Sequence, residues 1–425
     1  MSEWAQVRFG DVLTEPVRNG IYKPKEFHGR GCHIVNMGEL FAHPRLRTVE
    51  MSRIELTEKE KQKFLLQNND LIFARRSLTA EGAGKCSLVY DLSEETTFES
   101  SIIRARPDQS KASSPFLYYY FNSPQGKHLL RTILRQVAVS GITGSDLMEL
   151  RLDIPPLKEQ KAIAKILSAF DDKIELNRRM NATLEAMARA LFKAWFVDFE
   201  PVHANRENRP STSASPEIAK LFPSDFENGI PEGWHIRKLG DVLEAKGGTT
   251  PSTKNPSFWD GEHYWATPKD LSNLQHPVLL TTERRITDEG VRQVSSGVLP
   301  KGTLLLSSRA PIGYLAISHV PVSINQGFIA IQGKDVSNLY MLFWLKENME
   351  SVKSRANGST FQEISKSSFR ELQIAIPTSS IRGKFDSLVK PIFGRIVGNE
   401  IEHRNLAEIR DSLLPRLISG KIKVG

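Results

Sequence analysis

An internal repeat is the feature that most constrains how this chain of 425 residues folds. Residues 4–13 share a leading Trp and a closing Gly-Asp-Val-Leu with residues 234–243, at the same spacing. Residues 69–76, a polar turn leading into an apolar strand that ends on arginine, correspond to residues 302–309. A repeat of half a chain this long predicts two similar folded parts in tandem rather than one core.

A long amphipathic helix is expected after each copy of the repeat. After Pro155 and again after Pro377, apolar side chains recur three or four residues apart, which is the spacing of one buried helix face. The expected buried positions are Ile163, Ile166, Leu167, Phe170, Ile174, Met180, Leu184, Met187, Leu191 and Trp195 in the first helix, and Phe385, Leu388, Ile392, Ile396, Leu406, Ile409, Leu413 and Leu417 in the second. The first helix spans about forty residues, or roughly 60 Å. Pro391 predicts a kink or a delayed start in the second.

An apolar stripe of that length needs a partner in water, so the two helices are expected to pair with each other. Asn177 and Asn399 fall at matching places in the two repeats, at or near the expected seam, where a polar residue can fix the register. Two alternatives stay open: each stripe packs on its own domain, or the two asparagines lie on the surface.

The globular parts are predicted to be mixed α/β, with short strands separated by Gly, Pro, Asn and Asp, and helices on one side of a curled sheet. The expected strands are residues 71–74, 87–90, 303–306, 315–317 and 328–331, and the expected helices are 115–134 and 336–353. The order predicted along the chain is a first globular domain over 1–155, a long helix over 156–200, a polar linker over 201–232, a second globular domain over 233–377 and a second long helix over 378–425.

The composition favours a polyanionic partner. The formal net charge is +8, and surplus lysine and arginine favour phosphate contacts that release counterions. The start of the chain lacks a basic and then apolar signal region, and no uninterrupted apolar run is long enough for a membrane span, so a cytoplasmic protein is expected. Cys32 and Cys86, the two cysteines, are expected to be free thiols.

The sequence contains no convincing match to the residue constellations of common enzymes. Neither a Gly-rich methyltransferase turn nor an Asn/Asp-Pro-Pro-Tyr/Phe tetrad is present. Residues 82–86 resemble a phosphate loop faintly, but Cys86 stands where Ser or Thr would bind magnesium, so a β-turn is expected. Asp153 with residues 159–161, and Asp241 with residues 244–246, fit a nuclease spacing that often arises by chance.

Several sequence motifs identify the chain as similar to the specificity subunits of type I restriction-modification enzymes. Ile-Pro-Glu-Gly-Trp at 230–234 and Trp-Ala-Thr-Pro-Lys-Asp-Leu at 265–271 resemble the opening of a target recognition domain in this family. The stretch from Ile154 to Phe196 resembles the family's central conserved helix, and Leu-Leu-Pro-Arg-Leu-Ile-Ser-Gly at 413–420 resembles its C-terminal ending. The resemblance covers essentially the whole chain, although the first domain departs more from the family pattern.

The resemblance implies a subunit without catalytic activity that specifies, for its partner subunits, a DNA sequence made of two separated halves. It implies two α/β (α+β) target recognition domains related by a pseudo-two-fold internal repeat and joined by a pair of long antiparallel coiled-coil-like helices. Each domain would read one half of an asymmetric bipartite site in double-stranded DNA, and the helices would set the spacing. Two modification subunits, which methylate adenine, and the ATP-driven restriction subunits would dock on this chain. S-adenosylmethionine, ATP and Mg would belong to those subunits, and no cofactor or metal would be bound here.

The residues expected to contact DNA come from repeat equivalence and from the side chains that suit groove and phosphate contacts. They are Lys23, Asn36, Arg75, Arg76 and Ser101 in the first domain, and Thr250, Lys269, Ser308, Arg309 and Gln326 in the second. Each has a solvated or structural role as its alternative. Trp259 and Trp265 are expected to fill a core, with stacking as the alternative. The competing function is a self-contained, diverged DNA methyltransferase or nuclease.

Overall fold

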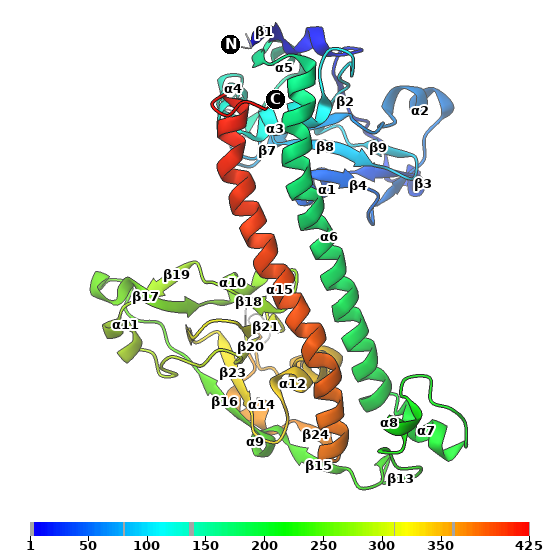
Figure 1. The fold of residues 1–425 in the computed structure, drawn as a ribbon, viewed down its shortest axis with the longest axis vertical. Coiled ribbons are helices and arrows are strands. Elements are labelled where there is room, and N and C mark those ends of the chain that lie inside the picture. The colour runs from blue at the N-terminus through cyan, green and yellow to red at the C-terminus, as the bar shows by residue number, and fades with distance from the viewer. Residues whose placement is uncertain (1–3, 80, 136–139, 310, 359–361, 425) are drawn as a thin grey trace. The chain divides into compact units, whose positions relative to one another are not determined.

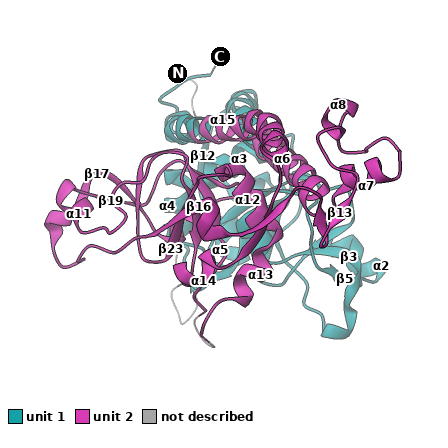
Figure 2. Ribbon diagram, turned by 90° about the horizontal axis from the view of Figure 1, so that it is seen from below, with its two compact units in different colours: residues 1–174, 405–425 teal, residues 175–404 magenta. Residues whose placement is uncertain are grey.

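The chain divides into two compact units: unit 1 combines the two ends of the sequence, and unit 2 is the continuous segment between them. In the computed structural model, unit 1 comprises residues 1–174 and 405–425, and unit 2 comprises residues 175–404 (Figure 2). The structure describes residues 4–79, 81–135, 140–309, 311–358 and 362–424.

The core of unit 1 is a five-stranded sheet with the order β2-β10-β6-β8-β4. Its strands are Arg18–Asn19, Ile102–Ala105, Leu71–Ala74, Cys86–Asp91 and Arg45–Arg47, and every pair is antiparallel except β4 with β8. Because side chains alternate along a strand, Leu71 and Phe73 face one side of this sheet while Ile72 and Ala74 face the other. Both sides are therefore buried, which explains the continuous apolar run of β6.

Different layers cover the two faces of this sheet. One face packs on α3 (Ser114–Asn122) and on parts of two long helices, α6 (Leu157–Phe196) and α15 (Ser379–Ile418) (Figure 1). The other face packs on α1 (Met37–Ala42) and on residues of a small sheet, β5-β3-β9, with strands Arg53–Ile54, His28–Val35 and Thr96–Phe98. Two short ladders join β1 (Ala5–Arg8) to β12 (Arg151–Ile154) and β7 (Arg76–Ser77) to β11 (Ser140–Gly141). The helices α2 (Glu58–Phe64), α4 (Pro124–Thr132) and α5 (Gly144–Glu149) complete the unit.

Unit 2 repeats the strand order of the large and the small sheet, which confirms the predicted repeat. Its large sheet has the order β16-β23-β20-β21-β18, with strands Leu243–Gly247, Phe328–Gly333, Leu304–Ser307, Leu315–Ser318 and Val278–Leu279. Its small sheet, β19-β17-β22, comprises Arg284–Ile286, Trp259–Ala266 and Val322–Ile324, and β15 (His235–Lys238) pairs with β24 (Gln373–Ile376). Its helices are α9 (Leu239–Val242), α10 (Pro268–Ser272), α11 (Asp288–Arg292), α12 (Asn338–Glu347), α13 (Met349–Ser354) and α14 (Lys366–Arg370).

The segment expected as a polar linker is packed rather than extended. It carries α7 (Glu200–Arg206), α8 (Pro216–Ala219), β13 (Phe226–Glu227) and β14 (Ile230–Pro231). Val202 and Phe222 are buried in the main core of unit 2. The polar run after Glu200 is tied down by that carboxylate, which accepts hydrogen bonds from Thr212 N and Ser213 Oγ.

The two long helices pair with each other in antiparallel fashion within each unit. In unit 2, Asn177 Nδ2 donates to Glu402 Oε2 at 2.9 Å, and Asn399 Nδ2 donates to Asn181 Oδ1 at 2.7 Å. In unit 1, Arg410 Nη1 lies 2.5 Å from Asp171 Oδ1. Residue numbers rise along α6 as they fall along α15, so the expected pairing is confirmed, and Asn177 and Asn399 are buried in the seam.

The buried stripe on α6 agrees with the prediction only in part, since Ile163, Leu167, Ile174 and Trp195 are buried as expected and two other positions are not. Met187 is 56% exposed and Ile166 is 36% exposed. Most buried positions follow a heptad spacing in which polar side chains take part: Gln160, Ala164, Leu167, Asp171, Ile174, Asn181, Ala188, Phe192 and Trp195; Ile163, Asn177 and Phe196 are buried beside this row. Hydrophobic spacing alone missed the polar members Gln160, Asp171 and Asn181, because these are stabilised by hydrogen bonds that the pattern does not show.

Pro391 neither delays nor interrupts α15, contrary to the expectation. The helix begins at Ser379 and continues through the proline to Ile418. Pro391 is exposed, as is Ser387, the residue four positions before it. The carbonyl that loses its helical donor therefore lies on the solvated face, where water replaces the missing hydrogen bond.

Candidate nucleic-acid interface

The candidate interface is built in each unit around one tight turn that joins the small sheet to the large one. In unit 1 the turn connects β9 to β10, and in unit 2 its counterpart connects β22 to β23. Arg75 N donates to Ser101 O at 2.8 Å, and at the equivalent place Ser308 N donates to Gly327 O at 2.8 Å. The two units thus present the same backbone framework with different side chains.

A glycine packs against each turn. Gly20 in unit 1 and Gly248 in unit 2 occupy equivalent places just beyond β2 and β16. A Cβ at Gly20 would overlap the carbonyl oxygen of Glu99, and a Cβ at Gly248 would overlap that of Ile324. Only glycine permits so close an approach of two backbones. This contact fixes the loop after the first strand of the large sheet against the turn.

In unit 2 the structure gathers the predicted residues around this turn. Thr250 Oγ1 donates to Gln326 Oε1, and Ser308 holds the turn through its backbone. Ser308 is 3% exposed, so its hydroxyl is not on the surface. Arg309 follows it, with Nη1 lying 3.6 Å from Glu363 Oε2. Lys269 is exposed but paired, its Nζ lying 2.8 Å from Glu283 Oε2, and this carboxylate raises the pKa of the lysine.

In unit 1 the predicted residues are less closely grouped. Arg75 and Ser101 lie at the turn, and Arg75 Nη1 also donates to Ser100 O. Arg76 is exposed and, among the described residues, has no ion pair. Its guanidinium is therefore free for an external anion or base.

Asn36 and Lys23 have structural partners within unit 1. Asn36 is the N-cap of α1 in a capping box with Glu39, whose carboxylate accepts a hydrogen bond from Asn36 N at 2.8 Å. Lys23 Nζ donates to Glu60 Oε2 at 2.8 Å and to Glu55 O at 2.9 Å, and its side chain is 10% exposed. Neither side chain is directed by these contacts to the turn.

Two groups of residues near the candidate interface were not predicted from the sequence. Lys85, in the turn that resembles a phosphate loop, donates to Phe41 O at 2.9 Å, and burial together with Lys127 lowers its pKa. In unit 2, Arg284 stacks on Trp259 beside the loop that carries Thr250. No spacing rule links Arg284 to Trp259, because antiparallel pairing of two strands brings them together. Burial of Trp259 and Trp265 confirms their expected core role.

The described part of the chain contains no cluster of three or more His, Cys, Asp or Glu side chains placed to hold a metal ion. Among the same residues, no helix combines the length and apolar character that crossing a bilayer requires. Cys32 and Cys86 are buried free thiols, as expected.

Comparison with known proteins agrees with the geometry. The family described as type I restriction modification DNA specificity domain matches residues 1–186 and 231–394. The MjaIX specificity subunit of Methanocaldococcus jannaschii is 40% identical over 182 residues, which is 42% of this chain and 42% of that protein. The HindI specificity subunit of Haemophilus influenzae is 26% identical over an alignment covering 99% of this chain and 100% of that protein.

A solved structure has a similar fold. The type I restriction-modification S subunit from M. genitalium superposes with a TM-score of 0.59 at 17% identity, covering 97% of this chain and 96% of that one. The family match includes both copies of the repeat, and the relatives are named as specificity subunits, which favours DNA recognition over the competing enzyme function. This chain belongs to the type I restriction-modification DNA specificity family, whose members are non-catalytic DNA-recognition subunits.

Proposed function

We propose that this chain determines which asymmetric, bipartite DNA sequence a type I modification and restriction complex recognises, with one half-site read by each unit. The observation that carries the proposal is the pair of equivalent turns. Their backbones are held by the same hydrogen bond, while Glu-Ser-Ser at 99–101 in unit 1 is replaced by Asn-Gln-Gly at 325–327 in unit 2. Two domains that recognise different bases are expected to share a backbone framework and to differ in the polar side chains that it carries.

The proposed reading elements are the target recognition domains, over residues 1–155 and 233–377. The proposed contacts are the solvent-accessible side chains nearest each turn: the exposed Arg76 in the first domain, and in the second the exposed Thr250 and Gln326 with the half-buried Arg309. Arg75, Ser101 and Ser308 position the turns, and Lys23, Asn36 and Lys269 are proposed as weaker contributors because their polar groups have partners.

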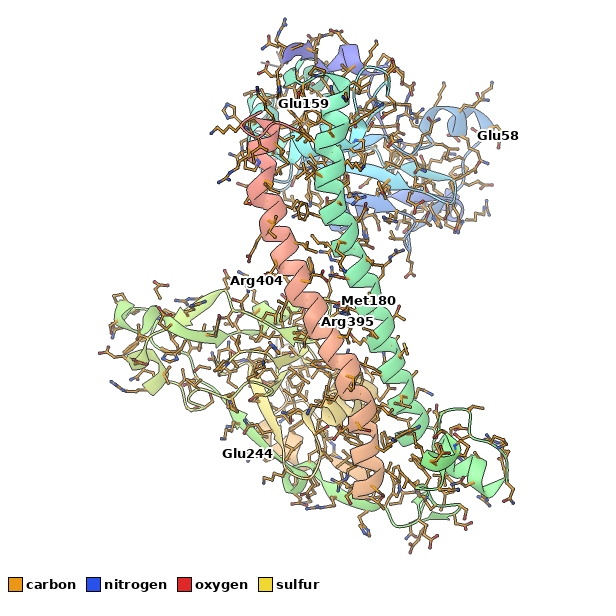
Figure 3. The ribbon with its side chains drawn as sticks, viewed as in Figure 1. Glu58, Glu159, Met180, Glu244, Arg395 and Arg404 are labelled. Carbon is orange, nitrogen blue, oxygen red and sulfur yellow. The ribbon has the colours of Figure 1, made fainter. Side chains whose placement is uncertain are left out.

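The long helices, over residues 156–200 and 378–425, are proposed to set the distance between the half-sites and to dock two modification subunits. Exposed apolar side chains on α6 support docking, because isolated helix surfaces in water are normally polar. Leu176 is 45% exposed and Met187 is 56% exposed, and Met180, labelled in Figure 3, lies between them on the same face at helical spacing. S-adenosylmethionine would belong to the modification subunits, and ATP and Mg to restriction subunits, so this chain would need no cofactor of its own. It would act in the cytoplasm.

The test is to express the chain with its modification subunit in a host that lacks adenine methylation and to map methylated adenines across the genome. We expect one split, asymmetric motif. Arg76→Ala should alter the motif in one half and Arg309→Ala in the other, because the two positions are equivalent in the repeat. A stable complex that methylates without a motif would contradict the proposal and favour an assembly scaffold. Methylation by the chain alone would favour the enzyme function.

A further inference from the structure

We propose that Arg284 is a specificity-determining residue that reads a guanine in the half-site of unit 2. The inference rests on the proposed function and adds a residue outside the turn to the reading surface. Arg284 lies on β19, directly opposite Trp265 of β17. Its guanidinium carbon lies 3.4 Å from the ring centroid of Trp259 and 5.8 Å from that of Trp265.

The two indoles form a rigid support on which the guanidinium stacks. Their ring centroids are 5.0 Å apart with planes at 85°, and the side chains are buried, with 6% of Trp259 and 4% of Trp265 exposed. Each indole nitrogen is also hydrogen bonded, Trp259 Nε1 to Ser252 O at 3.0 Å and Trp265 Nε1 to Thr249 O at 3.4 Å. These carbonyls flank Thr250, so the indoles join Arg284 to the loop of the candidate interface.

The stacked guanidinium is exposed and, among the described residues, has neither an ion pair nor a side-chain hydrogen bond. Stacking restricts its rotation and leaves its N–H donors unpaired at the edge of a plane. A planar pair of donors held in place matches the two acceptors, O6 and N7, that guanine presents in the major groove. Little side-chain entropy would be lost on binding, because stacking has already ordered the group.

The first copy of the repeat shows why a base, rather than a phosphate, is the expected contact. The strand register equates Trp259 with His28, Trp265 with Ile34 and Arg284 with Ser52. Unit 1 therefore has no counterpart of the stacked arginine. Both units would meet the same sugar-phosphate backbone but different bases, so a feature that is present in one copy alone fits a base contact.

Arg285 provides the matched control. It carries the same charge one residue along β19, and because side chains alternate along a strand, it points to the opposite face. It stacks on Tyr264 at 4.5 Å, lies 3.9 Å from Glu262, and has an arginine counterpart, Arg53, in unit 1. A residue present in both copies is not expected to distinguish two half-sites.

The experiment compares the complete modification complex carrying wild-type chain, Arg284→Ala, Arg284→Lys or Arg285→Ala. The methylated motif is mapped first. Binding is then measured with duplexes that carry the motif or each single-base change in the unit 2 half-site. With Arg284→Ala and Arg284→Lys, discrimination at one guanine should fall by roughly 5- to 150-fold while every other position is kept. Arg285→Ala should leave the motif unchanged.

Two results would overturn the inference while leaving the proposed function intact. The first is a motif that Arg284→Ala does not change. The second is binding that weakens equally on all duplexes, while the slope of log affinity against log salt concentration falls in magnitude by about one. That is the behaviour expected when a phosphate contact is lost. If the wild-type complex itself shows no motif, the proposed function fails instead, so the two failures are distinguishable.

Discussion

The Lys23–Glu60 pair shows how a single ion pair decides whether a basic residue is available to DNA. The ammonium of Lys23 and the backbone N–H of Thr57 both donate to Glu60, and they lower the pKa of this carboxyl from 4.5 to about 2. Because the folded-state pKa lies below the unfolded value, the stabilisation is fully present above about pH 4.5. It is lost as the pH falls toward 2.

We therefore expect Glu60→Gln to lower the urea midpoint by a constant amount between pH 6 and 8. The difference from wild type should narrow only below about pH 4.5, where the Glu60 carboxylate of the unfolded wild-type chain begins to take up a proton while that of the folded protein is still ionised. Urea titrations of both proteins at a series of pH values check this. A difference that grows as the pH falls would be inconsistent with a depressed pKa.

Gly248 tests the close approach at the candidate interface of unit 2. Gly248→Ala would force a Cβ into the carbonyl oxygen of Ile324, and we expect a loss of about 1–3 kcal/mol together with changed recognition of the unit 2 half-site. Gly383→Ala on the exposed face of α15 meets no atom within 4 Å, so it should instead stabilise the protein by about 0.5–1 kcal/mol. Thermal unfolding measures both variants. An unchanged Tm for Gly248→Ala would mean that the turn adapts to the added methyl group.

At the scale of elements, the helix seam contains a hydrogen-bonded asparagine pair. Asn181 Nδ2 donates to Glu400 Oε1 at 2.8 Å, and Asn181 Oδ1 accepts from Asn399 at 2.7 Å. Asn181→Ala leaves the Asn399 amide buried without its acceptor, so we expect a loss of about 1–3 kcal/mol. The double variant Asn181→Leu/Asn399→Leu should regain most of that stability, because no orphaned amide remains. Additive losses in a double-mutant cycle would show that the two side chains do not interact.

The elements themselves were largely predictable from the sequence. The strand Leu71–Ala74 and the first long helix were recognised because apolar runs and helical spacing extend over several turns or a whole strand. The polar members of the buried face of α6 were not predictable, because Asp171 and Asn181 are buried through partners on a helix more than two hundred residues away in the chain. Periodicity contains no information about such partners.

The candidate interface was predictable only in part. Repeat equivalence identified Arg76 and Arg309 as corresponding residues, since both follow an apolar strand at the same spacing. It did not show that Ser308 is buried, that Lys23 is paired, or that Arg284 stacks on Trp259. These facts depend on side chains brought together by strand register, which a single sequence does not determine.

At the scale of the whole molecule, neither repeat forms a unit without the other. The last turns of α6 follow the first copy in sequence, yet Phe192, Trp195 and Phe196 are buried in the main core of unit 2. Likewise, Leu417 and Ile418 follow the second copy and are buried in the core of unit 1. Each globular core therefore includes the end of a helix that the other repeat supplies.

This exchange predicts that a substitution at the C-terminal end of a long helix destabilises the unit that contains the other copy of the repeat. Trp195 is fully buried, stacks edge to face on Phe222 at 5.2 Å, and donates from Nε1 to Ser213 O at 3.1 Å. Trp195→Ala should destabilise unit 2 by about 3–5 kcal/mol, and the matched variant Leu417→Ala should destabilise unit 1 by about 2–5 kcal/mol. Hydrogen exchange should accelerate in β20 and β23 with the first variant and in β6 and β10 with the second. In the modification complex, each variant should weaken the half-site of the unit that it loosens. Faster exchange in β6 and β10 with Trp195→Ala would instead mean that each helix end stabilises its own repeat.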